Sequence, residues 1–319
     1  VDYASDGKYS TELFGEEAVR TIMEHDQQKP LFMVTSFQAV HGPSHSAPFQ
    51  YSRNCPALRN RCNGSKVSEH RATFAQVVTA MDMAIENITA ALHHRDMLQN
   101  TLIVFTTDNG AATIGADAWG SSNFPLKGGK HTIWEGGTRG VAAIWGHPVT
   151  SSPTFRPYTS NRMMHGVDWF PTFRDILERN GRRVLENGVH LDGVSQVSVL
   201  LNPTTPAARD SFVYGSVRES CSKLFPKFRL SKTAGCGFGI RDGDWKLVFR
   251  YGGYNDVSPK SSDTYVQKHS RKPAAAGEYL CPDNYCLYNI ALDPREQHEV
   301  RLFIGIVHSC VPPYRRSVL

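Results

Sequence analysis

Apolar runs of strand length alternate along this chain with stretches of helical periodicity, and this alternation limits the choice of fold. The runs are 31-LFMVTSF-37, 101-TLIVFTT-107 and 141-VAAIWG-146. Between the first two, apolar residues recur every three or four positions from about Ser68 to His94, which predicts a long amphipathic helix. Continuous apolar runs are typical of strands that are covered on both faces. The pattern therefore predicts an α/β fold with a mainly parallel sheet flanked by helices.

Two further helices are expected on either side of this region. Helical spacing of apolar residues begins after Thr11, a candidate N-cap, and we expect Pro30 to end that helix. The segment from Gly166 to Asn180 also has helical character, with Pro171 in its first turns, where proline is tolerated.

The sequence pattern changes beyond about Asp210. The stretch 238-FGIRDGDWKLVFRYG-252 places an Asp-Gly pair between two apolar segments, which is a strong hairpin signal. The run 285-YCLYNIALD-293 adds another expected strand. We therefore predict two domains: residues 1–209 as the α/β part, and 210–319 as a smaller antiparallel α+β subdomain.

Charge and composition exclude several classes of protein. The 319 residues carry a net charge of +5, with 20% charged and 40% hydrophobic residues, which is typical of a folded globular protein. No Lys/Arg block is interleaved with aromatic residues, so nucleic-acid binding is not expected. No apolar run approaches the roughly 20 residues that span a bilayer, so no transmembrane segment is expected.

Seven cysteines favour an oxidising compartment. Cys55/Cys62 and Cys281/Cys286 are spaced for small loops closed by disulfides, although the spacing leaves the pairing open. Zinc binding is the competing interpretation. It lacks a second CxxC-like pair with suitable histidine partners.

Two Asn-x-Ser/Thr triplets support the same compartment. They make Asn63 and Asn87 candidate N-glycosylation sites, and Asn87 falls on the polar face of the long predicted helix. Cysteines and triplets together predict a protein of the secretory pathway.

Polar residues follow two of the predicted strands. His41 follows the first, Asp108 and Asn109 end the second, and Lys130 lies on the loop after it. Ligands of open α/β sheets collect beyond the carboxyl ends of the strands, so we expect these residues to converge. A carboxylate and an amide oxygen suit Ca²⁺ or Mg²⁺ rather than zinc, but two donors are too few for either ion.

Each of these residues also has an ordinary structural interpretation. An Asp-Asn pair after a strand is commonly a turn or a helix cap, and a single loop histidine or lysine is commonly solvated. We expect Lys127 to be a solvated lysine. We expect the stretch Trp134–Gly137 to be a scaffold in which the indole ring packs and the glycines allow unusual backbone geometry.

The run 106-TTDNGAATIG-115, followed by 124-FPLKGGKHTIWEGGTRG-140, resembles the sulfatases, and within them the N-acetylgalactosamine-4-sulfatase (arylsulfatase B) branch. Further matching stretches include 30-PLFMVTSFQAVHGP-43 and 287-LYNIALDPREQHE-299, so the resemblance covers nearly the whole chain. It implies an alkaline-phosphatase-like α/β fold and a lysosomal or secreted protein.

The resemblance also implies roles for the four polar residues. Asp108 and Asn109 match calcium ligands, Lys130 matches the lysine that binds the substrate sulfate, and His41 matches the histidine that contacts the sulfate and its leaving oxygen. His41 and Lys130 are thus the expected catalytic and substrate-binding residues. Their chemistry suits this assignment, because a cation and a proton donor stabilise the charge that develops on the leaving oxygen.

One family motif has no match in this sequence. Sulfatases attack with a formylglycine made from the cysteine of Cys-x-Pro-x-Arg. In 55-CPALR-59 the proline is one place early, and in 310-CVPPYR-315 the arginine is one place late. We therefore expect the nucleophile and the remaining calcium ligands in an N-terminal part that this sequence lacks, which a companion chain could carry.

Three functions stay open at this point. The first is calcium-dependent hydrolysis of sulfate esters, with sulfated small molecules or glycosaminoglycan sugars as substrates. The second is a truncated non-catalytic chain that at most binds sulfated glycan. The third is a phosphohydrolase of the alkaline-phosphatase-like superfamily, which would need several His and Asp ligands for two metals.

Overall fold

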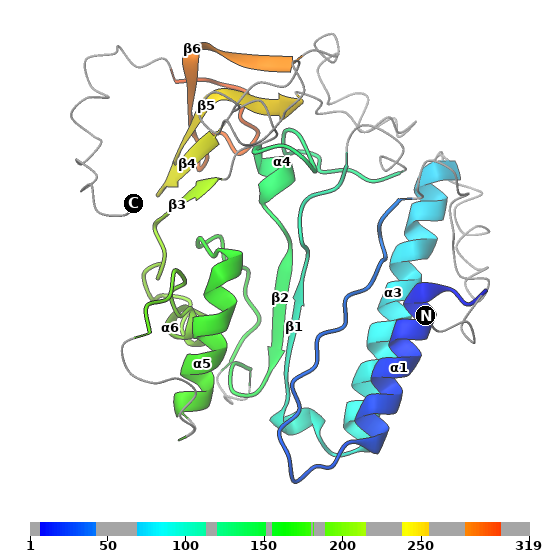
Figure 1. Cartoon of the computed structure of the whole chain (residues 1–319). Coiled ribbons are helices and arrows are strands. Elements are labelled where there is room, and N and C mark those ends of the chain that lie inside the picture. The colour runs from blue at the N-terminus through cyan, green and yellow to red at the C-terminus, as the bar shows by residue number, and fades with distance from the viewer. Residues whose placement is uncertain are drawn as a thin grey trace.

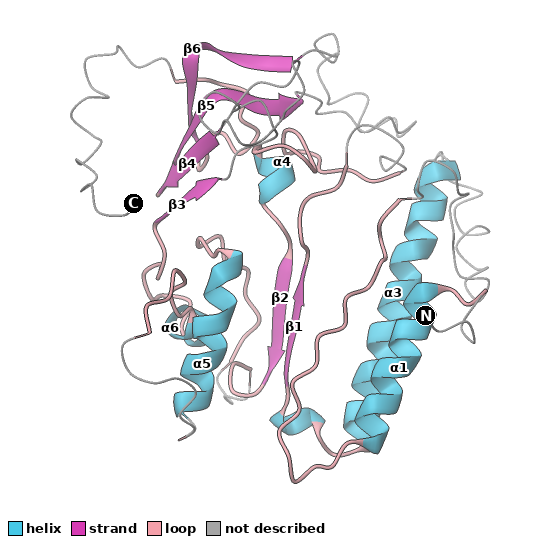
Figure 2. Cartoon of the chain, viewed as in Figure 1, coloured by secondary structure: helices cyan, strands magenta, loops and turns pink. Residues whose placement is uncertain are grey.

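The computed structural model describes residues 7–42, 69–112, 120–150, 155–179, 181, 189–214, 238–254 and 278–300. Helical elements and strands follow one another as in Figures 1 and 2. The helical elements are α1 (Ser10–Glu24), α3 (Glu69–His94), η2 (Leu98–Asn100), α4 (Glu135–Thr138), η3 (Gly166–Asp168), α5 (Trp169–Arg179) and α6 (Val197–Leu201). The strands are β1 (Leu102–Thr106), β2 (Ala142–Gly146), β3 (Ser211–Tyr214), β4 (Phe238–Asp242), β5 (Trp245–Tyr254) and β6 (Glu278–Asn289).

Helices α1 and α3 lie side by side along one edge of the molecule (Figure 1). Ile22 of α1 and Leu92 of α3 belong to one buried apolar cluster. Gly15 allows the close approach, because a Cβ atom there would lie 2.9 Å from the Cβ of Ala84. The apolar repeat of the long predicted helix is thus its packing face.

Helix α1 differs from the prediction at both ends. It begins at Ser10 with Tyr9 as the N-cap, and no side chain caps it, so Thr11 is not the cap but a buried residue of the first turn. It ends at Glu24, well before Pro30. Burial of the apolar stripe decides these limits more than the capping and breaking residues do.

Strands β1 and β2 form an antiparallel pair in which Leu102 is opposite Gly146 and Thr106 is opposite Ala142. Both strands were predicted, but the expected parallel pairing is not present among the described strands. The chain turns back after the loop that contains α4, and it therefore enters β2 in the direction opposite to β1. The predicted strand 31–37 is extended but pairs with no described strand.

The C-terminal antiparallel sheet confirms the prediction, with strand order β3-β4-β5-β6. The predicted hairpin is present: Asp242 ends β4 opposite Trp245, and Gly243 and Asp244 form the turn between them, Gly243 with a positive φ of 52°. The register of β5 and β6 shifts between the pairs Phe249–Tyr285 and Tyr251–Leu280. Cys286 on β6 is disulfide-bonded.

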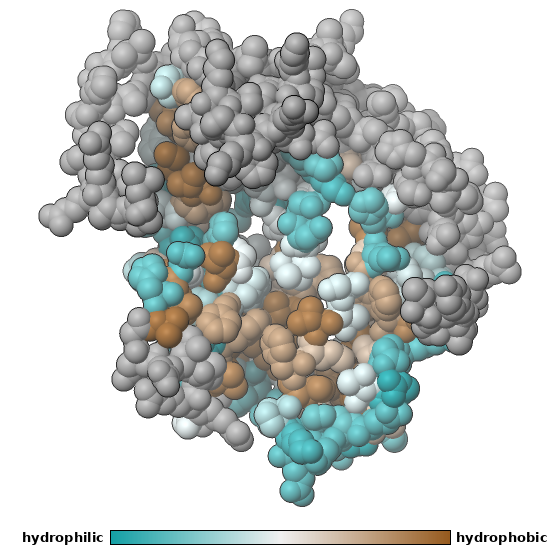
Figure 3. Space-filling model, viewed as in Figure 1, coloured by the Kyte–Doolittle hydropathy of each residue, from teal (hydrophilic) through white to brown (hydrophobic). Residues whose placement is uncertain are grey.

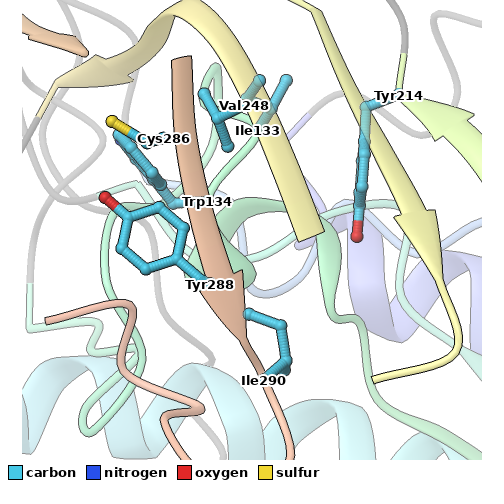
Figure 4. Close-up of a cluster of buried hydrophobic side chains, with 7 residues drawn as sticks. All are labelled: Ile133, Trp134, Tyr214, Val248, Cys286, Tyr288 and Ile290. Carbon is cyan, nitrogen blue, oxygen red and sulfur yellow. The ribbon is translucent and has the colours of Figure 1, made fainter. Parts of the chain in front are cut away.

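A buried cluster joins this sheet to the segment before α4 (Figure 4). Its residues are Ile133, Trp134, Tyr214, Val248, Cys286, Tyr288 and Ile290. The rings of Trp134 and Tyr288 meet edge to face, with centroids 6.0 Å apart. Because residues before and after position 210 share this core, the division into domains 1–209 and 210–319 stays a prediction.

Helix α5 follows η3 directly, with Pro171 in its first turn as predicted. The buried carboxylate of Asp168 fixes this junction: it accepts hydrogen bonds from the backbone N–H groups of His165 over 2.8 Å and Val194 over 2.9 Å. The guanidinium of Arg209 pairs with the same carboxylate at 2.6 Å.

Within the described residues, none of the helices has the length and apolar character needed to cross a membrane.

Candidate functional site

The side chains of His41 and Lys130 meet, although 89 positions separate them in the sequence. The ammonium nitrogen of Lys130 lies 2.9 Å from Nε2 of His41. His41 is exposed and Lys130 is half-buried, so a solute can reach both groups. An ammonium and an imidazole side by side can bind a small anion, and the imidazole can also exchange a proton with it.

The hydrogen bonds of His41 define its tautomer. Nδ1 lies 2.8 Å from the carbonyl oxygen of Gly42, and a carbonyl can only accept. Nδ1 therefore carries the proton in the neutral ring. Nε2 then presents its lone pair to the ammonium of Lys130. Only a second protonation, at Nε2, would make His41 a proton donor toward a bound ligand.

Backbone hydrogen bonds tie the loop that carries Lys130 to the end of β1. The N–H of Lys130 donates to the carbonyl of Ala111 over 3.0 Å, and the N–H of Gly110 donates to the carbonyl of Gly137 over 3.0 Å. The amide of Asn123 adds a second connection, since it accepts from Ala111 N–H over 2.8 Å and donates to Gly128 O over 3.0 Å. Asn123 was not predicted as a site residue, because no sequence pattern distinguishes it from an ordinary loop asparagine.

Glycines make this close contact possible. A Cβ atom on Gly110 would lie 1.7 Å from the carbonyl oxygen of Gly136. One on Gly136 would lie 2.3 Å from the carbonyl oxygen of Gly128. Any side chain at either position would push the Lys130 loop away from β1.

A buried network of charges supports the same loop from the other side. The ammonium of Lys246 on β5 lies 2.9 Å from Glu135 Oε1 and 2.8 Å from Glu296 Oε1. Glu296 Oε2 also accepts the backbone N–H of Glu135 over 2.7 Å. Burial acts to lower the pKa of Lys246, but the two carboxylates outweigh it and raise the pKa overall. Lys246 therefore stays charged.

Lys127 lies beside this network, and the prediction that it is solvated is wrong. Only 5% of the residue is exposed, and its ammonium lies 3.6 Å from the centre of the Trp134 ring. It also lies 3.4 Å from the carbonyl oxygen of Glu296. Burial lowers the pKa of Lys127 to about 8. No sequence pattern distinguishes Lys127 from the accessible Lys130 three residues later, because the burial of Lys127 depends on the turn after β6 that carries Glu296.

Trp134, Gly136 and Gly137 act as the scaffold that the sequence predicted, and Trp134 is completely buried. Glu135 was not singled out. Its position in a glycine-rich turn gives no sign that the carboxylate points into the core toward Lys246.

Asp108 and Asn109 bond locally. Asp108 Oδ1 accepts the N–H of Asn109 over 2.8 Å, and the Asn109 amide donates to Gly110 O over 2.9 Å. Neither side chain bonds to His41 or Lys130; the connection runs through the backbone of Gly110 and Ala111. The sequence predicted that the four residues converge, and the described geometry brings together one pair directly.

The calcium prediction meets a limit in the described residues. Carboxylate and amide oxygens are donors of the right kind, but Ca²⁺ takes six to eight oxygens, and this pair supplies two of them. No group of three or more His, Cys, Asp or Glu that could hold a metal occurs in the described part of the chain. These two residues alone do not form a calcium site.

Of the two candidate glycosylation sites, Asn87 is exposed on α3, on the side away from the apolar cluster. Asn63 lies outside the described residues, as do Cys55 and Cys62.

Comparison with known proteins gives a consistent result. A family model described as Sulfatase matches residues 2–178, more than half of the chain. Mouse arylsulfatase J is 26% identical over 309 residues, covering 93% of this chain and 46% of that protein. Mouse N-acetylgalactosamine-6-sulfatase is 31% identical over 136 residues, covering 42% of this chain and 23% of that protein. Almost all of this chain is matched by arylsulfatase J, but the chain spans only about half of the length of that protein.

Solved structures show the same fold. The crystal structure of Ps i-CgsB has a TM-score of 0.60 and 22% identity, covering 92% of this chain and 51% of the other. The structure of BT4656 in complex with its substrate D-glucosamine-2-N,6-O-disulfate has a TM-score of 0.51 and 16% identity, covering 96% of this chain and 68% of the other. These neighbours confirm the alkaline-phosphatase-like α/β fold class.

Proposed function

The chain belongs to the sulfatase family, and on that premise we propose that it forms part of a sulfuric ester hydrolase in which His41 and Lys130 bind the sulfate group. The observation that carries the proposal is the 2.9 Å contact between Lys130 Nζ and His41 Nε2. The prediction of a sulfatase is confirmed at family level. The arylsulfatase B branch, the calcium dependence and the substrate stay proposals.

The geometry supports separate roles for the two side chains. A sulfate oxygen that enters between them takes the place of His41 Nε2 as the acceptor for the Lys130 ammonium. The new hydrogen bond joins two charged groups and is therefore charge-assisted. Lys130 then stabilises the negative charge of the sulfate oxygens as the S–O bond breaks. This interaction strengthens toward the transition state, which is the condition for catalysis rather than mere binding.

His41 faces the leaving oxygen in this proposal. With Nδ1–H held by the carbonyl of Gly42, the second nitrogen is the one that points to the ligand. When protonated at Nε2, it can donate that proton to the leaving alcohol.

The remaining parts of the reaction lie outside this chain's described residues. A formylglycine would supply the nucleophile, and we propose that it and further calcium ligands come from a part of the protein that this sequence does not contain. Asp108 and Asn109 would then add two oxygen ligands to that calcium. A companion chain carrying those groups is part of the proposal.

Sulfated sugars are the proposed substrates. One matching relative is named for N-acetylgalactosamine 6-sulfate, which supports a sulfated amino sugar as the substrate class. A phosphohydrolase with two metals is less well supported, since such enzymes bind their metals through several His and Asp ligands, whereas a single Asp108–Asn109 pair with Lys130 fits sulfate better.

The alternative function is a non-catalytic chain that binds sulfated glycan. Both functions need the His41–Lys130 site, so two measurements separate them. Inorganic sulfate titrated into the ¹⁵N-labelled chain should shift the signals of His41, and Lys130→Ala should remove the effect. Lys29→Ala, at an exposed lysine paired with Asp26, is the matched control. Aryl sulfate turnover by the protein together with its nucleophile-bearing part then distinguishes an enzyme from a binding protein. Unchanged sulfate shifts in Lys130→Ala would count against both.

A further inference from the structure

Three residues other than glycine have a positive φ in the described part of the chain: Asp96 at 54°, His131 at 72° and Glu296 at 51°. A side chain crowds the backbone in this left-handed region, so few residues other than glycine enter it. Where one does, the strain is kept because the surrounding structure or a function requires it. Each of the three positions therefore needs a physical reason.

Asp96 and Glu296 have structural reasons. The N–H groups of Asp96 and Met97 donate over 3.0 and 2.9 Å to carbonyl oxygens of α3, and a left-handed residue commonly closes a helix in this way. Glu296 is 1% exposed, and its carboxylate lies 2.8 Å from the ammonium of Lys246. Neither reason applies to His131, because it ends no helix and is exposed.

His131 lies in a tight turn formed by Gly129, Lys130, His131 and Thr132. The N–H of Thr132 donates to the carbonyl oxygen of Gly129 over 3.0 Å, which closes the turn. The hydroxyl of Thr132 donates to the same oxygen over 2.7 Å and accepts the N–H of Gly129 over 3.2 Å. A positive φ at the third position of such a turn favours glycine or asparagine. The turn is thus well fixed, and it holds a histidine where glycine would relieve strain.

The same turn places His131 at the proposed sulfate site. Of residues 120–137, His131 alone is exposed, and all the others are buried or half-buried. It directly follows Lys130, so the Cα atoms of the two residues lie about 3.8 Å apart. The ammonium of Lys130 lies 2.9 Å from Nε2 of His41. The strained residue is therefore the exposed neighbour of the pair to which we assign sulfate binding.

We propose that His131 is a specificity-determining residue, which forms a hydrogen bond with a hydroxyl of the sugar that carries the sulfate. The inference rests on the proposed function, in which the sulfate group lies between Lys130 and His41. A sugar ring is larger than the sulfate and extends beyond those two side chains, where His131 is the next exposed side chain of the loop. A neutral imidazole has one nitrogen that donates and one that accepts, so it can bond a hydroxyl in either tautomer.

The surroundings and the rigidity of the turn suit this role. Hydrophilic residues gather near the end of β1 on the face shown in Figure 3, whereas apolar residues lie over β1 and β2 themselves. A fixed turn also holds the histidine in place before the sugar binds, which lowers the entropy cost of the hydrogen bond. The strain at His131 is then a cost in stability that is kept for recognition.

Glycine at position 131 separates recognition from structure. His131→Gly relieves the positive φ and removes the ring, so the urea midpoint of the variant should equal or exceed that of wild type. Two sulfate esters are titrated into the ¹⁵N-labelled 319-residue chain: methyl sulfate, which has no hydroxyl, and N-acetylgalactosamine 6-sulfate. Wild type should bind the sugar sulfate more tightly. His131→Gly should reduce that preference by about two- to tenfold, the value of a single hydrogen bond, and should bind methyl sulfate as wild type does.

Asp96→Gly is the matched control. Asp96 is also exposed and has a φ of 54°, but it precedes β1, whereas the loop that carries Lys130 contacts the chain beyond the other end of that strand. Glycine there relieves the same kind of strain away from the site. Both affinities should stay at their wild-type values.

The outcomes separate this inference from the proposed function. A urea midpoint of His131→Gly below that of wild type would assign the residue a structural role and overturn the inference. An unchanged preference for the sugar sulfate in that variant, or no preference in wild type, would also overturn it and leave the sulfate site intact. Binding of neither ester by wild type would refute the proposed function, and the inference would fall with it.

Discussion

The ammonium of Lys246 on β5 lies 2.9 Å from the carboxylate of Glu135, 111 residues earlier in the chain. Lys246 is completely buried and Glu135 is 4% exposed. Because Glu135 begins the short helix α4 directly after the loop that carries Lys130, this contact connects the C-terminal sheet to that loop. The sheet therefore helps to set the position of the loop.

Replacing Lys246 with methionine should destabilise the protein strongly. The change leaves the carboxylates of Glu135 and Glu296 buried near each other without the cation between them, and breaking a buried pair costs about 3–5 kcal/mol. Urea denaturation monitored by tryptophan fluorescence measures the loss. Lys29→Met, at an exposed lysine, should change the midpoint little, and an equal effect of the two changes would argue against the network.

Gly136→Ala should also destabilise the protein and loosen the Lys130 loop. The added methyl group would meet the carbonyl oxygens of Gly128 at 2.3 Å and Lys127 at 2.5 Å, so the backbone must move. We expect a loss of about 2 kcal/mol or more, together with weaker sulfate binding. Gly166→Ala is the control, since a Cβ atom there meets nothing within 4 Å. Equal stability of the two variants would contradict the packing described here.

The sequence predicted the elements of the fold better than their pairing. Helical character identified α3 and α5, continuous apolar runs identified β1 and β2, and an Asp-Gly pair between two apolar segments identified the β4–β5 hairpin, because each signal is local in the sequence. Pairing direction depends on how the chain returns between elements. The loop between β1 and β2 contains a short helix, yet it brings the strands together antiparallel. The run 31–37 has a strand pattern, but no pattern can show whether a partner is present.

The residues of the candidate site also fall into two groups, those that the sequence identified and those that it did not. His41 and Lys130 were recognised through a motif, and they meet in space. Lys127, Glu135, Lys246 and Glu296 were missed, although they hold the loop in place. Each is an ordinary charged residue in sequence. Their importance arises from burial, which is created by contacts between residues more than 100 positions apart.

The tautomer of His41 can be tested directly. Nδ1 should carry the proton in the neutral ring, because its partner is the carbonyl oxygen of Gly42. Long-range ¹H–¹⁵N correlation spectra of the imidazole, recorded above its titration, should show a pyrrole-like Nδ1 and a pyridine-like Nε2. Lys130→Met should move mainly the Nε2 signal, as that nitrogen loses a donor at 2.9 Å. The opposite tautomer would contradict the two hydrogen bonds assigned to the ring, one from Nδ1–H to Gly42 O and one from the Lys130 ammonium to Nε2.

Lys127 should give the protein a stability that rises with pH in the alkaline range. Burial lowers the pKa of its ammonium in the folded protein from the usual 10.5 to about 8. Between these two values the unfolded chain binds more protons than the folded one, so the free energy of unfolding increases with pH. The shift corresponds to a gain on the order of 3 kcal/mol across that interval.

Lys127→Met removes this titration, so the difference in unfolding free energy between wild type and variant should move in favour of wild type as the pH rises from about 8 to 10.5. Lys246, whose pKa is raised, contributes its own change only above that interval and does so in both proteins. Urea midpoints measured at several pH values provide the comparison. Lys29→Met, with a side chain 75% exposed, should follow wild type throughout. If the difference in unfolding free energy between wild type and Lys127→Met stays constant with pH, the pKa of Lys127 is not lowered. That result would contradict the burial of its ammonium against Trp134.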